Sequence, residues 1–140
     1  MYLPPAAFLA ACSSVSVTSP APAVEHAAEI PGFFSAEQAE RGRASYRQAC
    51  SECHTLSEFQ GADFEWAWRR QTAWRLYREI SANMPEDRPG ELSAETYADI
   101  VAYLLSRNGY QVGSADLVPT EEALAAIALG AGAPKTKTKE

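Results

Sequence analysis

The chain has 140 residues, about the length of one domain, with 18 acidic and 12 basic side chains and a formal net charge of −6. A nucleic-acid-binding protein usually presents a basic face, so this balance argues against that class. A hydrophobic content of 46% fits a packed domain. No stretch reaches the roughly 18 apolar residues that indicate a membrane-spanning helix. Three cysteines are an odd number, which argues against a framework made only of disulfides.

The first twelve residues have the character of an export signal. They are mostly apolar, and the string Leu9-Ala10-Ala11-Cys12 resembles a bacterial lipoprotein signal, in which the cysteine is lipidated and becomes the mature N-terminus. No Lys or Arg precedes the run, and the run is short for a signal peptide. A translation start assigned too late would explain both features. Residues 13–34 have the Ser, Pro and Ala content of a flexible linker. We expect a lipid tether at Cys12, with a chance cysteine in a loose N-terminus as the alternative.

A first helix is predicted to begin at Ser35. Serine is a good N-cap, and Gln38 follows three residues later, as in a capping box. Gly42 and Tyr46 then recur at helical spacing. A glycine inside a helix costs about 1 kcal/mol relative to alanine, so Gly42 indicates a neighbouring backbone that approaches closely.

This helix leads into Cys-Ser-Glu-Cys-His at residues 50–54, which is the C-x-x-C-H signature of covalent c-type haem attachment. Cys50 and Cys53 lie about one helical turn apart, so both sulfurs can reach the two vinyl groups on one porphyrin edge. His54 can then direct its imidazole at the iron. We therefore predict one covalent haem c, held by Cys50 and Cys53, with His54 as the proximal iron ligand.

Three other uses of this segment are weaker. A redox-active cysteine pair is expected beside a βαβ pattern, and the sequence shows no strands here. A zinc site needs four ligands, and the adjacent Cys53 and His54 are poorly placed around one tetrahedron. A structural disulfide leaves His54 without a role.

With these residues in place, the sequence resembles the class I c-type cytochromes over residues 35–117. The resemblance implies an all-α fold in which the N- and C-terminal helices cross over the covalently bound haem. Gly42 and Tyr46 match the N-terminal helix of that family, and Tyr103 and Leu104 are then expected on the other side of the crossing.

Residues 55–71 are the least regular part of the sequence. Their aromatic side chains suit either the walls of a flat cofactor or an ordinary core, and the sequence leaves both interpretations open for Phe59, Phe64, Trp66 and Trp68. In the family, a backbone carbonyl after the motif accepts the second N–H of the proximal histidine, in a loop commonly marked by proline. No proline occurs between His54 and Met84, so the sequence does not identify this acceptor.

Met84 is the predicted distal iron ligand. A helix over residues 72–83 must end before Pro85, because proline disfavours helical backbone at the preceding residue. Met84 is the only methionine besides Met1, and His26 in the linker is the other candidate ligand. The Met-Pro dipeptide also matches the axial methionine of the family. A His/Met pair leaves no open position on the iron, which suits an electron carrier rather than an oxygenase or peroxidase.

The strongest helix prediction covers residues 94–107, with Ser93 as N-cap and Asn108-Gly109 as the stop. The string from Met84 to Leu117 resembles the cytochrome domains associated with bacterial quinoprotein dehydrogenases, which use pyrroloquinoline quinone (PQQ). This implies such a dehydrogenase as a partner class. A short helix over residues 120–127 is expected, followed by a disordered Lys-rich tail.

The predicted organisation is a signal-like segment at 1–12, a linker at 13–34, a cytochrome c domain at 35–117 and a C-terminal extension at 118–140. The predicted function is a periplasmic monohaem electron carrier between a dehydrogenase and a later carrier or terminal oxidase, not an enzyme in itself. The alternatives are a permanent haem subunit of a dehydrogenase or oxidase complex, or a five-coordinate haem sensor or enzyme. No nucleic-acid partner is expected.

One stretch of this acidic domain is strongly basic. Residues 66–78 hold four arginines and no acid. Some of these arginines can pair with haem propionates, since buried carboxylates need donors. They can also form a positive rim that steers an acidic redox partner, or simply a solvated helix face. The sequence leaves these three interpretations open.

Overall fold

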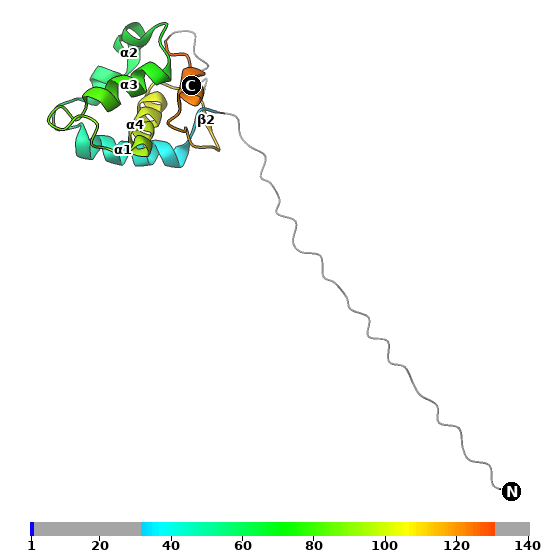
Figure 1. The fold of residues 1–140 in the computed structure, drawn as a ribbon. Coiled ribbons are helices and arrows are strands. Elements are labelled where there is room, and N and C mark those ends of the chain that lie inside the picture. Colours follow the sequence, from blue (N-terminus) through cyan, green and yellow to red (C-terminus); the bar gives the residue numbers. More distant parts are fainter. Residues whose placement is uncertain (2–31, 131–140) are drawn as a thin grey trace.

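The computed structural model describes Met1 and residues 32–130. The predictions for Cys12, for most of the linker and for the Lys-rich tail lie outside the described residues. The described part is mainly helical (Figure 1). Its helices are α1 (Ala36–Ala49), the short 3-10 helix η1 (Leu56–Phe59), α2 (Gly61–Trp68), α3 (Ala73–Asn83), α4 (Ala94–Arg107) and α5 (Glu121–Ala125).

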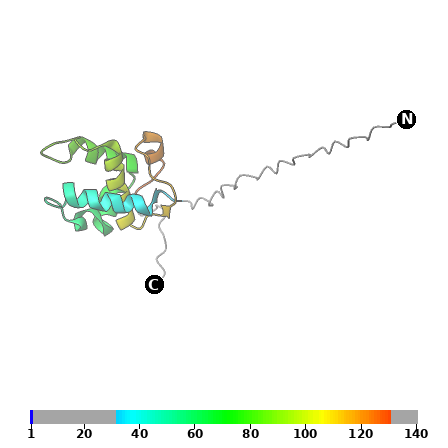
Figure 2. The same cartoon turned by 90° about the horizontal axis from the view of Figure 1, so that it is seen from below.

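The crossing of α1 and α4 is the centre of the fold (Figures 1 and 2). A Cβ atom at Gly42 would lie 1.8 Å from the carbonyl oxygen of Asp99 and 2.9 Å from the Cβ of Tyr103. The two backbones therefore touch where Gly42 predicts a close neighbour. The rings of Tyr46 and Tyr103 pack beside this point with centroids 5.6 Å apart. The predicted helix crossing is confirmed.

The N-terminus of α1 is capped as predicted, but its capping box is only half formed. The Ser35 hydroxyl accepts a hydrogen bond from the Gln38 backbone N–H at 2.9 Å. The Gln38 side chain does not return to Ser35. Its Nε2 donates to the carbonyl of Leu117 at 2.9 Å, and its Oε1 accepts from the Leu117 N–H at 2.6 Å. The buried Gln38 thus joins α1 to the chain that follows α4.

The ends of the helices at α3 and α4 also follow the sequence. Thr72 precedes α3, and Met84 directly follows its last residue. Ser93 caps α4 by accepting from the Thr96 N–H, and Asn108 is its C-cap. None of the helices among the described residues combines the length and the apolar character that crossing a membrane requires.

A two-residue parallel ladder joins β1 (Phe34–Ser35) to β2 (Val112–Gly113), with Phe34 opposite Val112. The sequence did not predict it, because two residues are too few to show a strand period. The residues after β2 then pack onto the main core. α5 lies against α3, and Leu124, Ile127 and Leu129 are buried. The predicted helix over 120–127 is thus a single short turn, and the segment around it belongs to the core.

Candidate functional site

The cysteine motif begins where α1 ends. Cys50 is the C-cap of α1, and its N–H donates to the carbonyl of Tyr46 at 2.8 Å. Its own carbonyl then accepts from the N–H groups of Cys53, at 3.1 Å, and His54, at 2.9 Å. This turn gathers the two sulfur-bearing residues and the imidazole within a single bend of the chain. Both cysteines are free thiols, with Cys50 partly buried and Cys53 exposed.

Burial raises the pKa of the Cys50 thiol. A redox-active C-x-x-C pair needs the opposite shift, since its nucleophile is a thiolate. Among the described residues there is also no group of three or more His, Cys, Asp and Glu side chains arranged to hold a metal ion. The motif therefore has the character of neither a redox pair nor a zinc site.

The ring of His54 is held by Glu58 and Phe59. Its Nδ1 lies 3.2 Å from Oε2 of Glu58, and its ring meets Phe59 edge-on at a centroid distance of 5.3 Å. If Nε2 were to bind the iron, Nδ1 would be the nitrogen left to donate, and Glu58 would be its acceptor. This acceptor is a carboxylate, whereas the family resemblance implies a backbone carbonyl.

Glu58 is fixed in place by the residue next to His54. Its Oε1 accepts from both the N–H and the hydroxyl of Thr55, each at 2.7 Å. These bonds, followed by the one to His54, hold the pKa of Glu58 at about 2, so its carboxylate is charged at neutral pH. The pattern Thr55-x-x-Glu58 is a capping box for η1. That pattern is visible in the sequence, and it is the signal that would have identified Glu58.

Met84 lies at the other end of the candidate site, on the turn that follows α3. Its N–H donates to the carbonyl of Ile80 at 2.9 Å, which closes the last turn of the helix. Its carbonyl accepts from the Tyr97 hydroxyl at 2.6 Å and from the Gly90 N–H at 3.4 Å. Met84 itself is partly buried. Its backbone is thus tied to α3, to α4 and to its own loop.

A small apolar cluster connects the motif with this turn. Its buried part comes from the helix crossing and comprises Tyr46, Ile100, Tyr103 and Leu104. Its rim is partly buried. The motif and the residues after it contribute Cys50, Leu56 and Phe59, α3 contributes Ile80, and the end of the loop that follows Met84 contributes Leu92. Apolar side chains left partly exposed on three segments make a surface that a flat apolar group can cover. The residues present therefore fit a porphyrin attached at Cys50.

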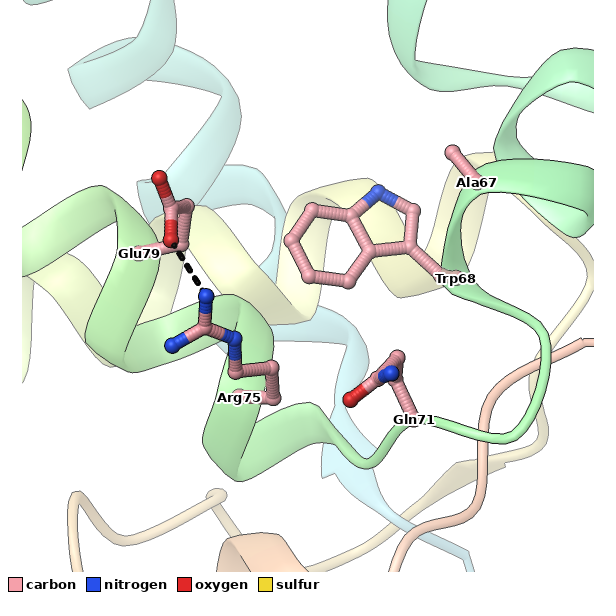
Figure 3. A pocket seen from close by; sticks show the side chains of 5 residues that line it. All are labelled: Ala67, Trp68, Gln71, Arg75 and Glu79. Atoms are coloured by element: carbon pink, nitrogen blue, oxygen red, sulfur yellow. Dashed lines mark ion pairs between the residues drawn. The ribbon is translucent and has the colours of Figure 1, made fainter.

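A cavity of about 400 Å³ opens between α2 and α3, lined by Ala67, Trp68, Gln71, Arg75 and Glu79 (Figure 3). The indole of Trp68 extends from the end of α2 toward α3, where Arg75 forms an ion pair with Glu79 at 3.2 Å. The cavity is thus lined by the N–H donors of an indole, an amide and a guanidinium, which are groups that can donate hydrogen bonds to a carboxylate.

The aromatic residues of the irregular stretch have different roles. Phe64 is buried in the main core, Phe59 contacts His54, and Trp68 lines the cavity. Trp66 is 68% exposed, with the Arg69 guanidinium 4.7 Å from its ring centroid. The interpretation of Trp66 as a core residue is wrong.

Comparison with known families identifies the domain. Residues 37–104 match the family model described as cytochrome c oxidase, cbb3-type, subunit III. The match supports a class I c-type cytochrome domain over these residues. The comparison with curated proteins found no match, and neither did the comparison with solved structures. The predicted all-α cytochrome c fold is thereby confirmed, with covalently bound haem c as its cofactor.

The matched region spans the motif, Met84 and most of α4. The match supports a haem-based electron-transfer cytochrome, and such a domain implies a redox partner or a complex. The haem iron supplies a one-electron redox couple. The contribution of the polypeptide is to attach, orient and enclose that group.

Proposed function

We propose that the protein is an exported monohaem cytochrome that takes one electron from a dehydrogenase and passes it to a later carrier or oxidase. In this proposal Cys50 and Cys53 form the thioether bonds, His54 is the proximal iron ligand and Met84 the distal one. The observation that carries it is the shared apolar cluster, because Cys50 of the motif and Leu92, at the end of the loop that follows Met84, both contribute to its rim.

The ligand pair has consequences for function. A thioether sulfur is a soft ligand that favours ferrous iron, so Met84 would raise the reduction potential relative to two nitrogen ligands. The carboxylate of Glu58 on the other side acts in the opposite direction, since negative charge near His54 favours ferric iron. We infer that the working potential reflects a balance between these two residues.

The partner and location are part of the same proposal. The string from Met84 to Leu117 supports a PQQ-dependent dehydrogenase as electron donor, through its resemblance to cytochrome domains of that system. Covalent attachment of haem c takes place outside the cytoplasm, which supports a periplasmic location. A lipidated Cys12 would tether the domain to a membrane, and its variant Cys12→Ser would then be released into the soluble fraction.

Ligation by Met84 can be tested on the purified holoprotein. The oxidised protein should show a weak methionine-to-iron band at the red end of the spectrum, and the reduced protein should not bind carbon monoxide. Met84→Ala should abolish the band and open the iron to carbon monoxide. Survival of the band in the variant would refute ligation by Met84. Carbon monoxide binding by the native reduced protein would instead indicate the five-coordinate sensor or enzyme.

A second candidate is a permanent haem subunit of an oxidase or dehydrogenase complex. The observation in its favour is the family match itself, because the matching model describes a subunit of an oxidase. The size of the particle in a mild-detergent extract separates the two candidates. A free carrier would migrate as a small protein, and a subunit would migrate with its complex at every salt concentration.

A further inference from the structure

The Tyr97 hydroxyl makes the shortest hydrogen bond to the turn that follows α3 and begins at Met84, called the methionine turn below. Tyr97 lies in the first turn of α4 and is 2% exposed. Its hydroxyl donates to the carbonyl of Met84 at 2.6 Å. Its ring meets the ring of Tyr77 edge-on, with centroids 6.4 Å apart and planes at 84°. Tyr77 is in turn stacked on Trp74 at 5.6 Å, so the phenol is held between α3 and α4.

This bond acts on a residue whose backbone has few other restraints. The N–H of Met84 is fixed to Ile80 by the helix. Among the described residues, its carbonyl accepts only from Tyr97 and, at a longer 3.4 Å, from Gly90. The next residue in the chain is Pro85, which has no N–H to donate. The position of the turn relative to α4 therefore depends chiefly on the Tyr97 hydroxyl.

We propose that Tyr97 is a positioning residue for the axial sulfur of Met84, an inference that rests on the proposed role of Met84 as an iron ligand. For the sulfur to leave the iron, the turn has to move away from the haem pocket. That movement breaks the bond between Tyr97 and the Met84 carbonyl. A buried hydrogen bond thus opposes dissociation of the sulfur, although Tyr97 touches neither the iron nor the sulfur in this role.

The test is competition by imidazole for the distal position in the oxidised holoprotein, followed by loss of the methionine-to-iron band. The variant Tyr97→Phe keeps the ring and removes only the hydroxyl. We expect it to bind imidazole about fivefold more tightly than the native protein, which is about 1 kcal/mol at 1.4 kcal/mol per tenfold. This is the size of one intramolecular hydrogen bond.

Tyr77→Phe is the matched control. It removes a hydroxyl from the same aromatic group, and that hydroxyl forms no hydrogen bond with the described residues of the methionine turn. Its imidazole affinity should equal that of the native protein. A purely structural effect of losing a tyrosine hydroxyl would change both variants alike, and that result would overturn the proposal.

A measurement on the native protein covers the case in which Tyr97→Phe does not fold. Imidazole should increase hydrogen exchange at the Gly90 amide, because Gly90 shares the carbonyl acceptor with Tyr97. Unchanged exchange would show that the sulfur leaves without movement of the turn, and would overturn the proposal. Absence of the methionine band in native protein would refute ligation by Met84 and this inference together. A normal band with unchanged imidazole affinity in Tyr97→Phe would refute only the positioning role.

Discussion

Replacement of Gly42 by alanine should separate the two helices that form the centre of the fold. The added methyl carbon would lie 1.8 Å from the Asp99 carbonyl oxygen and 2.5 Å from its carbonyl carbon. Ordinary van der Waals contacts of a Cβ atom begin at 3.4 Å, so the shortfall is about 1.6 Å against the nearest atom. The two nearest atoms are backbone and the third is the Cβ of Tyr103, so no rotamer change can relieve the overlap.

The size of the effect follows from two opposing contributions. Alanine is a better helix former than glycine by about 1 kcal/mol. Overpacking of a core costs typically about 1–3 kcal/mol and more where the backbone has to move. Because moving α1 also disturbs the contact of Tyr46 with Tyr103, we expect a net loss of about 3 kcal/mol or more. That is a large part of the roughly 5–15 kcal/mol that stabilises a typical domain.

The assay is equilibrium unfolding of the holoprotein in guanidinium chloride, followed by the helical circular dichroism signal. Ala44→Gly, at an exposed position of the same helix, is the control for helix propensity alone and should cost about 1 kcal/mol. The two substitutions exchange the same methyl group in opposite directions, yet both should destabilise. A Gly42→Ala protein as stable as the native one would refute the close contact of the two backbones.

The remaining predictions concern the haem environment and the basic surface. Glu58→Gln should raise the reduction potential, because a neutral amide beside His54 stabilises ferric iron less than a carboxylate does. Each tenfold decrease in the stability of the ferric form relative to the ferrous form corresponds to about 59 mV. Potentiometry would check this, with exposed Glu52→Gln as the control, and an unchanged potential in both variants would contradict the role of Glu58. Arg69→Glu should slow electron transfer from an acidic partner without altering the haem spectrum, since Arg69 has no ion pair among the described residues. In stopped-flow experiments the effect should shrink between 0.1 M and 1 M salt, as the Debye length falls from about 10 Å to about 3 Å, whereas a change in the spectrum would indicate a contact with a propionate. Arg107→Glu, on another helix, is its control.

The parts of the fold that could be predicted from sequence are those set by local chemistry. Ser35 and Ser93 cap α1 and α4 because a serine hydroxyl satisfies a free N–H at a helix start. The end of α3 follows from Pro85, and the crossing of α1 and α4 was visible in the cost of Gly42 inside a helix. Each of these signals acts within a few residues of its own position.

What could not be predicted depends on residues far apart in the chain. Gln38 looked like half of a capping box, but its amide pairs with Leu117, 79 residues away. A local pattern cannot show that a distant backbone segment competes for the same side chain. The pairing of β1 with β2 and the packing of residues 124–129 on the core are likewise long-range, and neither leaves a period in the sequence.

One helix connects these distant contacts to the candidate site. At the N-terminal end of α4, Tyr97 holds the carbonyl of Met84. At the C-terminal end, the buried Asn108 donates to the carbonyl of Phe59 at 2.8 Å and accepts from the N–H of Gly61 at 3.0 Å. Phe59 is the residue that contacts the His54 ring. The two proposed iron ligands are thus positioned by opposite ends of the same rigid element. A fixed distance between them would keep the coordination unchanged on reduction and oxidation, which is the property that fast electron transfer requires.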